Sequence, residues 1–208
     1  LDWVTTTALR RNLLRHFGVT YHKLLTATAI HVDGEKVRPI DPLFLDPEGE
    51  FHALDQDRAQ ALDPMTIAID CGDGNSGDLT LRYSWLPPSF GATDKSRDAI
   101  GLNANERFPI IKAYHGLVFS RNGRVVDVQS RTPWTTFINN DRYIRVEVEF
   151  SASLDEAFGV TTSKQQVSLS PEMWNRLHIA GLPKAIEHLR SKVRTAKAER
   201  QRTASEPV

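Results

Sequence analysis

The stretch Ile144-Arg145-Val146-Glu147-Val148-Glu149-Phe150 decides the fold class of this chain, because apolar and charged residues alternate along it without a break. A period of two is that of a β-strand, in which successive side chains point to opposite faces of a sheet. The pattern predicts a strand over 142–150 whose apolar residues face the core, while Arg145, Glu147 and Glu149 face solvent. One buried and one wet face are typical of an antiparallel or mixed sheet backed by helices.

Further strands are predicted on both sides of two strong turn signals, Asp33-Gly34 and Asn122-Gly123. Such dipeptides favour tight hairpins because type I′ turns require positive φ at both central residues. A third pair of strands is joined by a glycine-rich loop, 71–77, and Pro87-Pro88 ends its second strand. The strands expected are 28–32 with 36–40, 65–70 with 78–86, and 116–120 with 124–130.

Helices are predicted at the two ends of the chain. The first is expected over 5–17, with Gly18 as its stop, and another begins at the cap Ser170-Pro171-Glu172 and ends near Gly181. The last helix is expected from Leu182 to about Arg202, with residues 55–62 as a polar connector of helical character and 89–107 as a long polar loop. The sequence therefore predicts an α+β fold, with a mixed, mostly antiparallel sheet covered by helices on one face.

Composition narrows the class of protein. The chain has 208 residues, of which 40% are hydrophobic and 25% charged, as in folded globular proteins. Its formal net charge is zero, which gives no global argument for nucleic-acid or membrane attraction. A single cysteine, Cys71, allows no internal disulfide, and no apolar run is long enough to span a membrane. We expect a cytoplasmic protein that does not bind membranes.

The N-terminal sequence begins with Leu1 and has neither an initiator methionine nor the features of a signal peptide. We therefore expect the chain to be a piece of a longer protein, with a function that depends on residues outside it.

A polar loop between two ordered elements is the strongest candidate for chemistry. The sequence Thr161-Thr162-Ser163-Lys164-Gln165-Gln166 lies between the strand that ends at Phe150 and the helix that starts at Ser170. One lysine on such a loop can place a positive charge where negative charge develops during phosphoryl transfer. The alternative is that Lys164 is an ordinary solvated loop lysine.

The loop resembles the one that the transducer domain of GHKL ATPases (gyrase, MutL, MORC proteins and the large heat-shock chaperones) extends into a neighbouring ATP-binding domain. Shorter stretches in the same order are similar to those of bacterial MORC-like members of this superfamily. They include the basic-turn hairpin and the strand that leads to the lysine. These stretches are 14–21, 32–34, 37–44, 116–124, 145–150 and 158–160.

The resemblance implies a transducer fold like that of a small-subunit ribosomal protein domain. Residues 1–26 would leave an ATP-binding domain, 27–193 would form the transducer domain, and 194–208 would be a polar tail. It also implies that Lys164 contacts the γ-phosphate as the catalytic residue, with Gln165 supporting the nucleotide contact. ATP and Mg²⁺ would be held mainly by the protein's own N-terminal ATP-binding domain, in a homodimer.

The sequence lacks the parts that would bind the nucleotide by itself. No helix carries the Glu and Asn that GHKL ATPases use as general base and magnesium ligand, and the glycine spacing of 73–77 differs from that of their adenine loop. We therefore expect 73–77 to be a hairpin connection, and the isolated chain to be inactive as an ATPase.

Other constellations were weaker. The seven histidines have no metal-ligand spacing and are expected at the surface or half-buried, so no metal site is predicted. Asp70, Asp73 and Asp78 could bind calcium, but their spacing is not that of an EF-hand loop, so a calcium site is not favoured. At Cys71 a buried or loop thiol is favoured over a nucleophile. Trp85, Trp134 and Trp174 are expected in the core or an interface.

The alternative function is a stand-alone interaction or nucleic-acid-binding module. The last helix carries a cationic series that could contact phosphates. Because Glu187 and Glu199 interrupt the series, a solvated helix face is the simpler interpretation. The cationic residues are Arg190, Lys192, Arg194, Lys197, Arg200 and Arg202.

Overall fold

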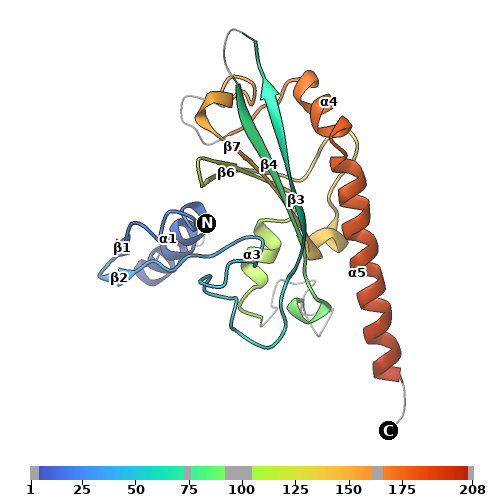
Figure 1. Cartoon of the computed structure of the whole chain (residues 1–208). Helices are drawn as coiled ribbons and strands as arrows, with labels where there is room; N and C mark the ends of the chain where they lie inside the picture. The colour runs from blue at the N-terminus through green and yellow to red at the C-terminus, as the bar shows by residue number, and fades with distance from the viewer. Residues whose placement is uncertain (1–4, 73–75, 92–104, 161–165, 206–208) are drawn as a thin grey trace.

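The computed structural model describes residues 5–72, 76–91, 105–160 and 166–205 of the chain. They form an α+β fold around a five-stranded sheet with the strand order β3-β4-β7-β5-β6 (Figure 1). Only β5 and β7 are parallel, and the other neighbouring pairs are antiparallel. The predicted mixed, mostly antiparallel sheet is thus confirmed. Its strands are β3 (Gln60–Asp70), β4 (Ser76–Trp85), β5 (Leu117–Arg121), β6 (Arg124–Gln129) and β7 (Ile144–Phe150).

Two C-terminal helices cover one face of the sheet. Helix α4 (Pro171–Ile179) begins at the predicted cap, where Ser170 Oγ accepts a hydrogen bond from Met173 N. Helix α5 (Leu182–Ser205) runs along the sheet and continues past its lower end to the C-terminus (Figure 1). The apolar residues of β7 and β4 pack against both helices in the larger core cluster, as the alternation along 144–150 predicted. None of the helices in the described ranges is both long and apolar enough to cross a membrane.

The opposite face of the sheet is also covered, which corrects the expectation of a wet face. Helix α1 (Thr6–Thr20), the chain up to residue 44, and helix α3 (Phe108–Ala113) lie on this side (Figure 1) and form a second apolar cluster with β5 and β6. Arg145 and Glu147 are 0% exposed beneath this layer, whereas Glu149 at the end of the strand stays partly exposed. Charged residues can occupy this face because other charges and carbonyl groups pair with them.

The turns follow the sequence signals more closely than the strand lengths do. Asp33, Gly34, Asn122 and Gly123 all have positive φ, as the hairpin prediction required. However, the first hairpin is short, with only β1 (His31–Val32) and β2 (Glu35–Lys36). The chain leaves this ladder because Pro39 has no N–H to donate and Val37 and Ile40 are buried in the body instead.

Gly18 does not end the first helix. Helix α1 starts at the predicted cap Thr5 but continues through Gly18 to Thr20. A Cβ at Gly18 would lie 2.7 Å from Arg38 O, and the Gly18 carbonyl accepts a hydrogen bond from Ile40 N at 3.0 Å. The glycine is therefore needed for the close approach of the chain at 38–40 rather than for a C-terminal stop.

Two further segments differ from the expectation. Residues 55–59 contain no helix and β3 already starts at Gln60, so the polar connector is shorter than expected and is not helical. Helix α3 was not predicted, since its six residues are too few to show a helical period. The long polar loop at 89–107 lies largely outside the described residues. Short 3₁₀ helices complete the fold at Pro88–Phe90 (η1), Asn139–Tyr143 (η2) and Ala152–Leu154 (η3).

Candidate functional site

The predicted catalytic residue Lys164 and its neighbour Gln165 lie outside the described residues, which end at Val160 and resume at Gln166. The structure therefore shows the two stems that carry this segment. The stem before it contains Phe158 and Gly159, and the stem after it contains Val167 and Ser168.

The two stems are joined to each other. Ser168 N donates a hydrogen bond to Phe158 O at 3.0 Å, so the chain leaves and re-enters the body at one point. Gly159 has φ of 54°, and a Cβ there would collide with Ser168 O. A glycine is required both for this left-handed backbone and for the close approach.

The first stem is fixed to the end of β7. The buried Phe158 ring stacks on the Phe150 ring, with centroids 4.0 Å apart and planes 6° from parallel. Val160 N donates to Asp155 O at 2.9 Å, and the Asp155 carboxylate accepts two hydrogen bonds from Arg121 of β5. This paired geometry raises the pKa of Arg121 further. The first stem is therefore anchored at the corner of the sheet where β5 and β7 end.

The second stem is fixed to β6. Asp127 Oδ2 accepts a hydrogen bond from Val167 N at 3.1 Å, and Gln129 Nε2 donates to Val167 O at 2.7 Å. The same Gln129 amide also donates to Asp127 Oδ2, so both polar groups of the Val167 backbone are held by one pair of side chains. The two stems are thus anchored by side chains of β5, β6 and β7 together.

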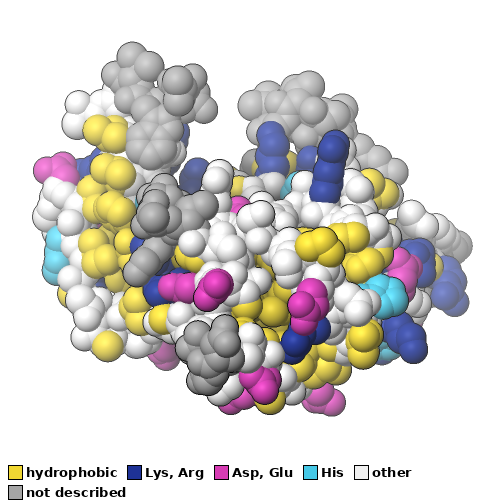
Figure 2. Space-filling model, turned by 90° about the horizontal axis from the view of Figure 1, so that it is seen from above, with side chains coloured by type: hydrophobic (Ala, Val, Ile, Leu, Met, Phe, Trp, Pro, Cys, Tyr) yellow, Lys and Arg dark blue, Asp and Glu magenta, His cyan; other side chains and the backbone are white. Residues whose placement is uncertain are grey.

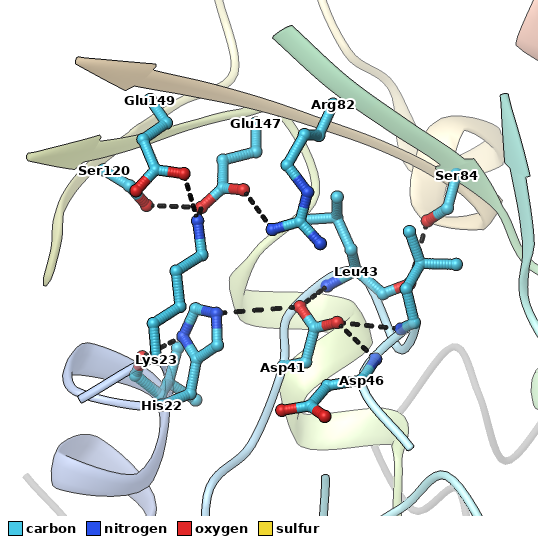
Figure 3. Close-up of polar contacts among 12 residues, drawn as sticks. His22, Lys23, Asp41, Leu43, Asp46, Arg82, Ser84, Ser120, Glu147 and Glu149 are labelled. Carbon is cyan, nitrogen blue, oxygen red and sulfur yellow. Dashed lines mark hydrogen bonds and ion pairs between the residues drawn. The ribbon is translucent and has the colours of Figure 1, made fainter. Parts of the chain in front are cut away.

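A buried charge cluster lies on the other side of β7 (Figure 3). Lys23, from the turn after α1, donates to Glu147 at 2.7 Å and to Glu149 at 2.6 Å. Arg82 of β4 and Ser120 of β5 donate to the remaining positions of the Glu147 carboxylate, at 2.9 and 2.6 Å. Burial alone raises the pKa of Glu147, but Lys23 and Arg82 outweigh it and hold the pKa below its ordinary value. Glu147 is therefore a carboxylate at neutral pH.

The neighbouring part of the cluster orders the chain between α1 and β3. The Asp41 carboxylate accepts hydrogen bonds from the backbone N–H groups of Leu43, Leu45 and Asp46 at 2.8–2.9 Å (Figure 3). His22 donates from Nδ1 to Val19 O, and its Nε2 lies 3.9 Å from Asp41 Oδ1. His22 is fully buried, so the expectation that each histidine is a surface or half-buried residue was wrong for this one.

The side chain of Arg145 binds carbonyl groups at the end of helix α3. Its guanidinium donates to Ile111 O at 3.1 Å and to Tyr114 O at 3.3 Å, carbonyl groups at the C-terminal end of the helix, where a cation is favourable. Burial lowers the pKa of Arg145 to about 9, while Asp41 acts in the opposite direction. The group therefore stays protonated at neutral pH.

These contacts connect two parts of the fold through the single strand β7. One part is the N-terminal layer, meaning α1 and the chain up to residue 44, and the other is the first of the lysine-loop stems, the two stems that flank 161–165. Lys23 binds Glu147 and Glu149 on β7, and Phe150, the next residue of that strand, stacks on Phe158. Sequence reasoning missed this link because 124 residues separate Lys23 from Glu147. The sequence does show charged residues and a serine on the segments that form β4, β5 and β7. This pattern alone does not reveal that they share a buried partner.

The remaining predicted positions form no shared site. Residues 71–75 connect β3 to β4, with Asp70 paired to Ser76, so the hairpin interpretation of this loop is confirmed; Asp73 lies outside the described residues. Cys71 is exposed on this connection. The rings of Trp134 and Trp174 pack edge to face, with their centroids 5.5 Å apart, and both lie against the larger core, as expected. Across the described ranges, no group of three or more His, Cys, Asp or Glu side chains is arranged to hold a metal ion.

Acidic and basic side chains are interspersed on the face shown in Figure 2, in agreement with the zero net charge. No protein-family model, curated protein or solved structure matches this chain. Its function therefore has to be inferred from the stems, the charge cluster and the loop sequence.

Proposed function

We propose that the chain is the transducer region of an ATP-dependent GHKL-type ATPase of the bacterial MORC-like kind. In this proposal Lys164 contacts the γ-phosphate of ATP bound by a neighbouring ATP-binding domain, and Gln165 supports that contact. The observation that carries the proposal is the anchored pair of stems at Phe158–Gly159 and Val167–Ser168, which join at one point and contact three strands.

The stems matter because a charge accelerates phosphoryl transfer only when it is held where negative charge develops. Electrostatic stabilisation depends on groups that are positioned before the reaction, so that they need not reorganise during it. A lysine ammonium is a compact point charge, suited to an oxygen of the γ-phosphate. A solvated surface lysine would need no such fixed support at both ends of a five-residue segment.

The link through β7 supplies a means of coupling. The turn after α1, which would lie next to the ATP-binding domain, is tied by Lys23 to β7, and the same strand supports Phe158. A movement of the N-terminal layer on nucleotide binding would therefore be transmitted to the lysine segment. Ordering or displacing a segment in response to the γ-phosphate is a known form of switching.

The proposed partners are the protein's own ATP-binding domain, with ATP and Mg²⁺ bound mainly there, and a second copy in a homodimer. The proposed location is the cytoplasm. The 208-residue sequence itself has no general-base helix and no adenine loop, so by this proposal it does not hydrolyse ATP alone.

The test is turnover by the full-length protein with Lys164→Ala. We expect kcat to fall about 100- to 1,000-fold, the usual loss for one donor to the transition state, with a much smaller change in ATP affinity. Lys164→Arg should rescue poorly because guanidinium is planar and bulkier. The matched control is Lys184→Ala, at an exposed lysine of α5. Turnover unchanged in Lys164→Ala, or lowered equally in the control, would contradict the proposal.

A further inference from the structure

A large open groove lies between the lower part of α5 and the edge formed by η1, η2 and helix α3. Its volume is about 1220 Å³, above the roughly 300–1,000 Å³ typical of small-molecule pockets. Helix α5 continues past the end of the sheet here (Figure 1), so the groove is open along the helix. The size and shape suit a segment of a polymer better than a compact metabolite.

The charged residues that line the groove are mainly basic. Five basic side chains line it, against two acidic ones, which leaves a formal excess of three positive charges. Hydroxyl and amide groups from the chain at 135–140 line the same wall and can donate hydrogen bonds. The basic residues are Arg142, Arg190, Arg194, Lys197 and Arg200, and the acidic ones are Asp141 and Glu187.

The structure separates this surface from the acids that interrupt it in the sequence. Glu199 does not line the groove, and Glu187 is paired with Arg190 at 2.6 Å. Asp141 is also paired with Arg190, at 2.8 Å, so one arginine forms ion pairs with both acids that line the groove. Arg194 and Arg200 are exposed and form no ion pair with any carboxylate in the described part of the chain. Glu199 therefore does not interrupt the cationic series on this side of α5.

The four cations of α5 that line the groove form a row along the helix. With a rise of about 1.5 Å per residue, side chains three or four residues apart on one helix face are roughly 4.5–6 Å apart along α5. Four of the five cations are arginines, whose guanidinium binds phosphate oxygens in a bidentate manner. Lys197 Nζ lies 4.0 Å from the centre of the Tyr143 ring, so a cation–π contact holds this lysine against the wall of the groove.

We propose that this groove binds a nucleic-acid strand through its phosphate backbone, with Arg194 and Arg200 as the principal contacts. Binding is independent of base sequence, because contacts to phosphates carry no sequence information. It also does not depend on Lys164 or on ATP, since the groove and the lysine-loop stems belong to different parts of the fold.

The experiment compares two variants with the same change in charge on the same helix. Arg194→Glu/Arg200→Glu alters the groove, whereas Lys192→Glu/Arg202→Glu alters exposed cations of α5 that do not line it. Binding of a fluorescein-labelled 20-nucleotide single strand and a 20-base-pair duplex is measured by anisotropy over a series of salt concentrations. Circular dichroism and thermal melting confirm that both variants fold, and Arg194→Gln/Arg200→Gln repeats the test without reversing charge.

The wild-type chain should bind at least one of the two oligonucleotides with a strong dependence on salt. The groove variant should lose at least about 10-fold in affinity, and the slope of log K against log salt should fall by about two for duplex, one for each lost phosphate contact. The control variant should lose no more than about 3-fold. Absence of wild-type binding, an equal loss in both variants, or tighter binding to a glutamate-rich peptide of the same charge would overturn the proposal.

Discussion

Replacing Lys23 by methionine should destabilise the fold by removing the cation that joins the N-terminal layer to β7. Methionine keeps most of the length and apolar stem of lysine, so the lost charge dominates the effect. Glu147 would stay fully buried with one neighbouring cation, Arg82, and the hydroxyl of Ser120. Glu149 would lose the partner that now lies 2.6 Å away.

The size of the effect follows from the burial of the two partners. Removing one member of a buried pair costs about 3–5 kcal/mol, because the other charge is left without compensation. Lys23 is 21% exposed and two donors to Glu147 remain, so we expect about 2–3 kcal/mol, at or below the lower end of that range. In urea this corresponds to a decrease in the unfolding midpoint of roughly 1 M.

Urea unfolding followed by tryptophan fluorescence measures this change, with Lys36→Met at an exposed site in β2 as control. The double variant Lys23→Met/Glu147→Gln should be more stable than the sum of the single effects by at least about 1 kcal/mol, since neutralising Glu147 removes the uncompensated charge. A Lys23→Met loss no larger than that of the control, or strict additivity, would refute the reasoning.

Two further predictions concern pH and the lysine-loop stem. Because Lys23 and Arg82 hold the pKa of Glu147 below its ordinary value of 4.5, the unfolded chain binds more protons as pH falls through this range. The contribution of Glu147 is thus complete above its ordinary value and is lost as pH drops through the lower, folded-state pKa. Between about pH 7 and about pH 3.5, the stability of Glu147→Gln should change less than that of the wild type. The stability of the exposed-site variant Glu172→Gln should follow that of the wild type. Equal acid dependence in all three proteins would contradict a lowered pKa of Glu147. Gly159→Ala should lower the free energy of unfolding by about 1–3 kcal/mol, because of the left-handed backbone and the clash with Ser168 O. It should also increase amide exchange at Val160 and Val167. In the control Gly34→Ala the new Cβ meets no atom within 4 Å, so those amides should be unchanged.

The sheet could be predicted because local patterns determine it. The alternation along β7 identified the strand and its buried side, and Asn122-Gly123 placed the β5–β6 turn where the structure has it. The cap Ser170-Pro171 likewise located the start of α4. Each of these signals involves residues that are close in the sequence.

The buried charge cluster could not be predicted, because its partners come from distant parts of the chain. Glu147 has the pattern of a solvent-facing strand residue until Lys23 and Arg82 are brought over it. Gly18 similarly has the local features of a helix stop, and only the approach of Arg38 reveals its role in packing. The groove on α5 was missed for the same reason, since Glu199 is near Arg200 in sequence but does not line the same surface.

The most direct test of the proposed function asks whether Lys164 reaches the terminal phosphate of bound ATP. An acyl-phosphate derivative of ATP transfers its acyl group to a lysine amine that lies next to the phosphates, and peptide mass spectrometry identifies the modified residue. In the full-length protein with Mg²⁺, Lys164 should be acylated, excess ATP should suppress the labelling, and exposed Lys184 should react only at background level. Labelling of other lysines of the nucleotide site with Lys164 unmodified would contradict the assignment of Lys164 to the γ-phosphate.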